Sequence, residues 1–172
     1  VERDFALARR LNAEDPELVR AYGEYLKSRA FSPGMNEKSY YEKVITVYKE
    51  ALERNPYLPE NYLRLAWVLA QAKQFDEAEE FLNEAVDANP FFLLSHIQRA
   101  HFYLFKNDLD KAAEEYAHVL DALMAMPYSP YSKANILLDQ MSRQAQAYPL
   151  HPALRGMYKR LVAYREQVAV AG

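Results

Sequence analysis

Residues 58–90 read L-P-E-N-Y-L-R-L-A-W-V-L-A-Q-A-K-Q-F-D-E-A-E-E-F-L-N-E-A-V-D-A-N-P. Apolar residues recur at helical spacing on both sides of a polar elbow at Lys73 and Gln74. Such spacing is typical of amphipathic helices, so the stretch predicts two short helices joined by a turn.

The same pattern recurs 34 residues away in both directions along the chain. At this offset Ala51, Asn55 and Pro56 fall on Ala85, Asn89 and Pro90, and Ala66, Asp76 and Ala78 fall on Ala100, Asp110 and Ala112. A fixed period of this length indicates a repeat protein in which each unit is one helix pair. Because one pair cannot bury its apolar faces alone, the repeats are expected to stack into a continuous core.

Elementary packing explains the residue types at the recurring positions. Two antiparallel helices need small residues where their backbones approach each other, and large apolar residues beside them. Alanine at positions 66, 78 and 85 fits the close approach. The Asn-Pro pairs end the second helix of each pair, because a residue before proline is pushed out of the α region.

With these positions in place, the chain resembles the tetratricopeptide repeat (TPR) family. The family pattern is matched through one repeat by Tyr62, Leu65, Ala66, Leu69, Phe75, Ala78, Leu82, Ala85 and Pro90. The next repeat departs from it, with Arg99 where leucine is usual and no closing proline until Pro127. The usual glycine of the turn is Lys73 in one repeat and Asn107 in the other; asparagine tolerates a left-handed backbone better than lysine does.

The resemblance implies an all-α fold, a TPR-like α-solenoid of antiparallel helix pairs with about nine helices. The predicted organisation is a TPR array over 1–128 and a divergent C-terminal helix pair, acting as a cap, over 129–172. The array divides into a partial repeat (1–15) and three repeats (16–58, 59–92 and 93–128). We expect helices at 4–13, 16–29, 37–55, 59–72, 75–88, 93–106, 109–125, 130–147 and 152–169.

Two parts of this organisation have more than one interpretation. The first helix is either the second half of a preceding repeat or an ordinary capping helix. The elbow of the first full repeat is longer than its counterpart, with 15 residues from Leu26 to Tyr41 where Leu69 to Phe75 has 6. The insertion at 27–40 is read as a tolerated surface loop or a functional one.

Composition narrows the class of protein. The chain has 172 residues and no cysteine, which excludes disulfides and fits a cytoplasmic or a bacterial periplasmic location. No apolar run reaches the roughly 18 residues of a membrane span. The charged start predicts no signal peptide, and the missing initiator methionine suggests a piece of a larger TPR-containing protein.

The charge is divided between an acidic body and a basic tail. Residues 1–128 hold 15 Lys and Arg against 22 Asp and Glu, and residues 129–172 hold 6 against 2. A broad basic face is absent, which argues against nucleic-acid binding. The basic residues of the last helix are read as a solvated face or, alternatively, as a site for an anionic partner.

The sequence predicts no catalytic, cofactor or metal site, so we expect the protein not to be an enzyme. It contains no glycine-rich phosphate loop and no H-E-x-x-H motif. His96 and His101 are five residues apart, which does not place two ligands on one helical face. Paired acidic residues recur at the repeat spacing and are read as the solvated face of the second helices.

The predicted site is therefore a surface. In the TPR family the first helices line a concave groove, which implies partner-binding residues at fixed repeat positions. Carried over, these are Arg20, Glu24, Lys27, Leu63, Trp67, Gln71, Leu94, Ile97, His101, Leu104 and Phe105. The lysine and asparagine clamp with which co-chaperone members hold a terminal carboxylate is absent. The predicted groove is polar at one end and apolar at the other.

An apolar groove suits an amphipathic helix or an apolar peptide of a protein partner, with Trp67 and Phe105 as candidate anchors. The first hypothesis is therefore a protein–protein interaction scaffold. Two alternatives remain: a homo-oligomerisation module using the same apolar face, or a regulatory or substrate-presenting TPR segment of a larger enzyme.

The register makes a prediction about the fold. Ala100 should lie where two helix backbones approach, so Ala100→Leu should overpack the pair and lower the free energy of unfolding by roughly 1–3 kcal/mol. Chemical denaturation of the two proteins measures the difference. An unchanged denaturation midpoint would mean that the register is misplaced.

Overall fold

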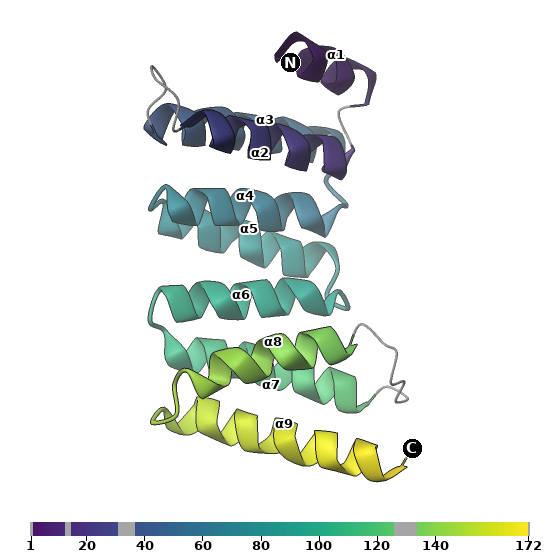
Figure 1. Cartoon of the computed structure of the whole chain (residues 1–172), viewed down its shortest axis with the longest axis vertical. Helices are drawn as coiled ribbons and strands as arrows, with labels where there is room; N and C mark the ends of the chain where they lie inside the picture. The colour runs from purple at the N-terminus through teal and green to yellow at the C-terminus, as the bar shows by residue number, and fades with distance from the viewer. Residues whose placement is uncertain (1, 13–14, 31–36, 126–133, 172) are drawn as a thin grey trace. The chain divides into compact units, whose positions relative to one another are not determined.

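The computed structural model describes residues 2–12, 15–30, 37–125 and 134–171, and these residues form α-helices with no strand (Figure 1). Over the described ranges there are nine helices: α1 (Glu2–Leu11), α2 (Pro16–Ala30), α3 (Glu37–Arg54), α4 (Pro59–Gln71), α5 (Phe75–Ala88), α6 (Leu93–Phe105), α7 (Leu109–Met124), α8 (Ala134–Gln146) and α9 (Pro152–Ala171). The all-α prediction is confirmed, and the described helix bounds lie within a few residues of the predicted ones. The predicted start of α8 at Ser129 and Pro130 and the centre of the predicted elbow insertion, 31–36, lie outside the described residues.

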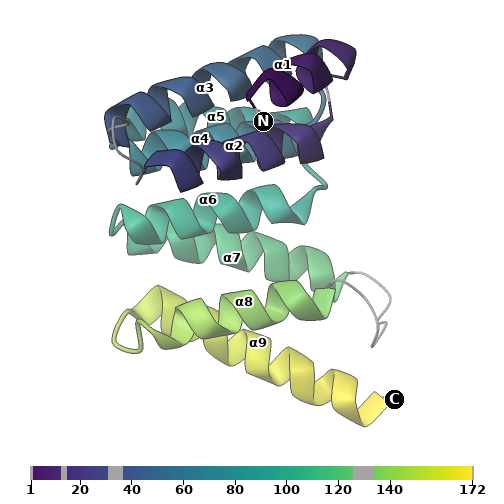
Figure 2. The same ribbon diagram turned by 45° about the horizontal axis from the view of Figure 1, so that its top comes forward.

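The helices form two compact units, Val1–Phe91 and Phe92–Gly172. The first contains α1 to α5 and the second α6 to α9, and each is described by itself (Figure 2). This division falls inside the segment 1–128 predicted as one array, and the predicted boundary at 128/129 stays a prediction. None of the described helices is both long enough and apolar enough to cross a membrane.

Three turns at helix ends have an Asp or Asn before a proline and share one hydrogen bond; we call them Asx-Pro corners. The side chains of Asp15, Asn55 and Asn89 accept a hydrogen bond from the backbone N–H two residues later, at 2.9, 3.3 and 3.2 Å. The residue before each proline is therefore held in a turn by its own side chain, in addition to being excluded from the α region. This local chemistry accounts for α3 ending at Arg54 and α5 at Ala88.

Each of the two short elbows is closed by the same hydrogen-bond pattern. After α4, Lys73 N–H donates to Ala70 C=O at 3.0 Å and Gln74 N–H to Leu69 C=O at 2.9 Å. After α6, the equivalent bonds run from Asn107 and Asp108, at 3.0 and 2.8 Å. This is the Schellman motif, which needs one residue in the left-handed region. That residue is Lys73 (φ 63°) in one elbow and Asn107 (φ 61°) in the other.

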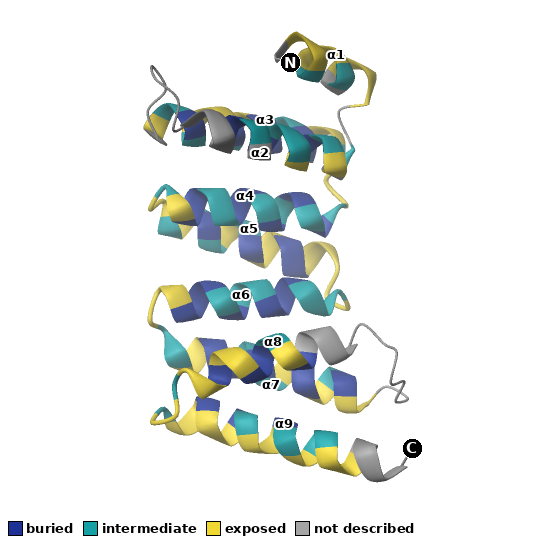
Figure 3. Cartoon of the chain, in the orientation of Figure 1, coloured by how far each residue is buried: buried dark blue, intermediate teal, exposed yellow. Residues whose placement is uncertain are grey.

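Each helix pair of the first unit has buried positions along its length (Figure 3), and small residues lie between the paired helices. Ala66, Ala78 and Ala85 are at most 1% exposed. In the α2–α3 pair the small residue is Gly23, where a Cβ atom would lie only 3.1 Å from the Tyr48 hydroxyl. Even alanine would be tight there unless Tyr48 shifted, so the glycine follows from the size of its neighbour.

The core of the second unit continues through the C-terminal helix pair. Ala100 and Ala112 are fully buried, as the register predicts, and so are Tyr116 and Leu120 of α7. Helix α9 contributes the apolar residues Leu154, Met157 and Leu161, each at most 3% exposed. Helix α9 packs against both α7 and α8, so it is an integral part of this unit.

The basic residues of α9 do not form a purely solvated face. Arg160 pairs with Asp121 of α7, and Arg165 pairs with Asp139 of α8. Tyr164 donates a further hydrogen bond from its hydroxyl to Leu123 C=O, at 3.3 Å. Partly exposed ion pairs stabilise little by themselves, but these three contacts fix the orientation of α9 on its neighbours.

The left-handed elbow residue generates a stability prediction. A left-handed backbone costs an L-residue about 1–2 kcal/mol, a cost that glycine does not have. Glycine in turn loses about 0.5–1 kcal/mol of conformational entropy on folding, so the net gain is smaller. Lys73→Gly should therefore raise the free energy of unfolding by about 0.5–1 kcal/mol, measured by denaturant titration. Asn107→Gly is the matched control and should gain less, because asparagine already tolerates this conformation. A loss of stability in Lys73→Gly would contradict the assignment of strain to this turn.

Candidate protein-binding face

The predicted site residues of the first unit lie on α2 and α4. Arg20 is exposed and bonded to Glu17 one turn earlier, with 2.8 Å from Nε to Oε2. The side chains of Glu24 and Lys27 lie outside the described ones. Trp67 is half-buried and Gln71 is exposed at the end of α4, so both can contact another molecule.

The predicted site residues of the second unit lie on α6, one turn after another. Leu94 and His101 are half-buried, and Phe105 at the end of the helix is 59% exposed. The Phe105 phenyl ring is the most exposed apolar group among the predicted site residues of α6. Phe105 is therefore the strongest candidate anchor for a partner.

Three of the predicted contact residues are buried. Leu63 is 5% exposed, Ile97 is 0% exposed and Leu104 is 7% exposed. A buried side chain of this kind packs against its neighbours in the core and exposes almost no surface to a partner. The repeat position alone could not predict this, since it gives the direction of a side chain and not what covers it.

His101 has an electrostatic environment that its repeat position did not indicate. Its ring meets the buried Tyr116 ring edge-on, with 5.9 Å between the centroids. Neither His101 Nε2 nor the Tyr116 hydroxyl has a hydrogen-bond partner among the described residues. Burial lowers the pKa of His101 and, with a smaller effect of Tyr148, raises the pKa of Tyr116. Both groups are therefore kept neutral beneath the face of α6.

A charged cluster on α6 and α7 explains why Arg99 departs from the TPR pattern. Glu115 lies 2.9 Å from His96 Nδ1 and 2.7 Å from the Arg99 guanidinium, and all three side chains are largely buried. Burial would raise the pKa of Glu115, but the hydrogen bond from His96 and the charge of Arg99 outweigh it and hold that pKa below its ordinary value. The ring of His118 packs on that of His96, with 4.2 Å between the centroids.

In the repeat of the first unit, the positions equivalent to the charged cluster form an apolar contact. Tyr62 and Phe81, 34 residues before His96 and Glu115, form an aromatic pair with 6.4 Å between ring centroids. Leu65 occupies the place of Arg99 and is fully buried. Comparing the two repeats position by position could have found this exchange, because three polar residues replace three apolar ones together.

The described residues contain no group of three or more His, Cys, Asp or Glu side chains that could hold a metal ion. The four residues of the charged cluster are used in pairing the two helices of one repeat.

A search with protein-family models agrees with the repeat pattern. The model described as tetratricopeptide repeat matches residues 40–95, from α3 into α6. This segment of the chain consists of tetratricopeptide repeats.

Two curated relatives match this chain over only part of their own length. A TPR repeat-containing protein of Methanocaldococcus jannaschii is 31% identical over 111 residues, covering 57% of this chain and 19% of the relative. The general transcriptional corepressor ssn6 of Schizosaccharomyces pombe is 30% identical over 79 residues, covering 46% of this chain and 7% of the relative. The chain thus spans a fifth or less of the length of these two proteins.

Solved structures show the same fold. The crystal structure of MamA superposes with a TM-score of 0.60 at 15% identity, covering 97% of the TPR chain and 88% of MamA. The MamA RS-1 ArsTM double mutant superposes with a TM-score of 0.57 at 19% identity, covering 96% of this chain and 84% of the mutant protein. At this level of identity the likeness establishes the helical repeat architecture.

The half-buried imidazole of His101, whose Nε2 atom is covered, predicts a pH dependence of stability. The pKa of His101 lies below its ordinary 6.5 in the folded state, so the unfolded chain takes up a proton first as the pH falls. The free energy of unfolding should therefore decrease as the pH drops through about 6.5, and urea titrations at pH 7.5 and 5.5 measure this loss.

His101→Phe keeps an aromatic ring against Tyr116 and removes the titrating group. We expect its stability to fall less between the two pH values than that of the unaltered protein. His118→Gln, which changes an exposed histidine on α7, is the control and should keep the original loss. Equal losses in the protein and in His101→Phe would contradict the role of His101.

Proposed function

We propose that this TPR chain is a protein–protein interaction scaffold that binds an apolar or amphipathic peptide or helix of a partner protein on the faces of its first helices. The observation that carries the proposal is Phe105, an open aromatic ring at the end of α6. Exposed aromatic residues beside closely packed ones are typical centres of binding energy at protein interfaces.

The character of the face supports a partner of mixed polarity. In the first unit the accessible residues at the equivalent repeat positions are Trp67 and Gln71, which pair an aromatic ring with an amide. In the second unit Phe105 is exposed, whereas His101 is half-buried and its Nε2 atom is covered. On the face of the first unit, an amphipathic segment could place an apolar side chain on the Trp67 ring and a polar one on the Gln71 amide. On the face of the second unit, an apolar side chain could lie on the Phe105 ring.

The proposal can be tested without knowing the natural partner. A phage-displayed library of 16-residue peptides is selected on the whole chain, and enriched peptides are measured by fluorescence anisotropy. Phe105→Ala and Trp67→Ala should each raise the dissociation constant by roughly tenfold, the cost of about 1–2 kcal/mol for losing an aromatic anchor.

The matched control is Phe91→Ala, which removes an aromatic ring that is 89% exposed at the corner after α5. It should leave binding unchanged. If no peptide is enriched, or if Phe91→Ala weakens binding as much as Phe105→Ala, the groove assignment fails. Light scattering of the same samples tests the alternative: concentration-dependent dimers abolished by Phe105→Ala would favour self-association through this face.

A further inference from the structure

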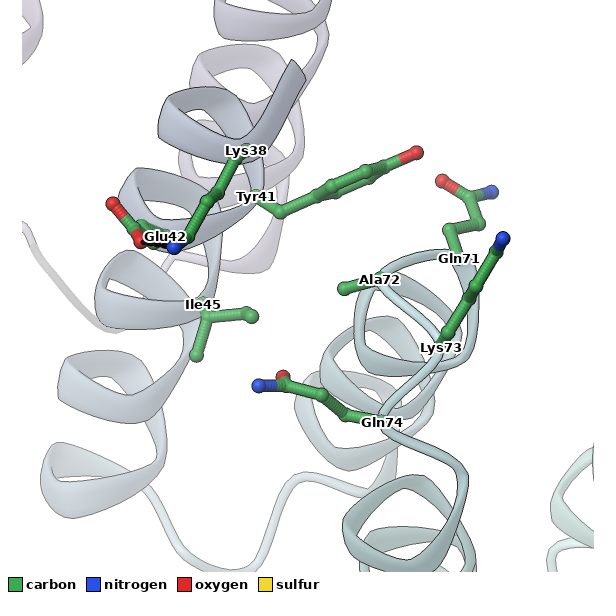
Figure 4. A pocket seen from close by; sticks show the side chains of 8 residues that line it. All are labelled: Lys38, Tyr41, Glu42, Ile45, Gln71, Ala72, Lys73 and Gln74. Atoms are coloured by element: carbon green, nitrogen blue, oxygen red, sulfur yellow. Dashed lines mark ion pairs between the residues drawn. The ribbon is translucent and has the colours of Figure 1, made fainter. Parts of the chain in front are cut away.

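A cavity of about 350 Å³ lies in the first unit between α3 and the elbow that joins α4 to α5 (Figure 4). Its inner surface is apolar and half-buried, formed by Tyr41 and Ile45 on one side of α3 and by Ala72 facing them from the elbow. A space of this size is large enough for a branched or aromatic group with a polar end.

The elbow surrounds the apolar part with hydrogen-bond donors. Gln71 and Lys73 extend side by side at the mouth, near the end of the Tyr41 ring that carries the hydroxyl, and the Gln74 amide points across the cavity toward Ile45 (Figure 4). Two amide groups, an ammonium and a phenol hydroxyl therefore border one small space. A ligand group that accepts several hydrogen bonds would fit this border.

Among the charged residues that line the cavity, Lys73 is the cation that could pair with a ligand. Lys38 and Glu42 lie on the α3 side, 4.0 Å apart, so each largely compensates the other. Lys73 has no ion-pair partner among the described residues. A ligand with a carboxylate would therefore meet a net positive charge on the elbow side.

The backbone at Lys73 supplies an independent observation. Lys73 occupies the left-handed position of the turn, where glycine or asparagine costs less, and Asn107 occupies that position in the second unit. Residues held in such a conformation cluster at functional sites, where the surrounding structure maintains them. The cation also lies favourably at the negative end of α4, but any cation in the last turn provides that without the strain.

We propose that this cavity binds a carboxylate carried on an apolar or aromatic group. The Lys73 ammonium and the elbow amides hold the carboxylate, while the apolar part lies against the Tyr41 ring and Ile45. The ligand is either a free organic acid or an acidic side chain next to an apolar one in a partner's segment. The site is separate from the anchors Trp67 and Phe105 and shares only Gln71 with the proposed groove.

The test uses the whole isotope-labelled chain and two carboxylate probes, 3-phenylpropionate and the peptide acetyl-Phe-Glu-amide, with 3-phenylpropylamine as the probe of opposite charge. Both carboxylates should shift the amide resonances of residues 71–74 in a saturable way, and the amine should not. Tighter binding of the free acid identifies an organic acid as the natural ligand class, and tighter binding of the peptide identifies a partner segment. Equal shifts from the amine would overturn the proposal.

Lys73→Gly separates ligand binding from folding, because this variant is expected to be more stable than the original protein. Its affinity for the carboxylates should fall about fivefold or more, so stability and binding move in opposite directions. Asn107→Gly relaxes the same turn in the second unit and should leave affinity unchanged.

Unchanged affinity in Lys73→Gly would overturn the assignment of the cation. Trp67→Ala should also bind the carboxylates normally, which keeps this result independent of the groove experiment. If Trp67→Ala abolished the shifts at residues 71–74, the cavity would not be a separate site and the proposal would fail.

Discussion

Close backbone approach between the two helices of each pair is the constraint on which the other structural features depend. It requires alanine or glycine at the crossing points, and the buried Ala66, Ala78, Ala85 and Gly23 meet this need in the first unit. Because the helices are short and the gap between them is fixed, the turns must also be short and specific. The elbows and Asx-Pro corners are therefore consequences of the packing distance as much as of local preference.

Most of the fold could be predicted from the sequence because its determinants are local and periodic. The small residues, the Asn-Pro pairs and the 34-residue offset each act within one or two helices, so their effect does not depend on distant contacts. The agreement of the described helix bounds follows from this. A position such as Ala100 is specified by its register, and the structure buries it fully.

The candidate site was less predictable because accessibility depends on tertiary contacts. The family positions predict both Phe105 and Ile97 as groove residues; Phe105 is 59% exposed, whereas Ile97 is fully buried. The burial of Asn61 and Ser95, two polar residues 34 apart on α4 and α6, likewise had no signal in the periodic pattern. Repeat spacing gives the direction of a side chain, whereas the neighbours that cover it come from other elements.

Departures from the repeat pattern proved more informative than matches to it. Arg99 matches the family pattern poorly, yet it forms an ion pair with Glu115, which also contacts His96. In the repeat of the first unit, a leucine and two aromatic residues occupy these three positions. Lys73 looked like a poor turn residue, and its side chain borders a cavity. In a repeat protein every position has an internal reference at the equivalent place in another repeat. A residue that breaks the local rule there while the fold persists is therefore a candidate for specificity or function.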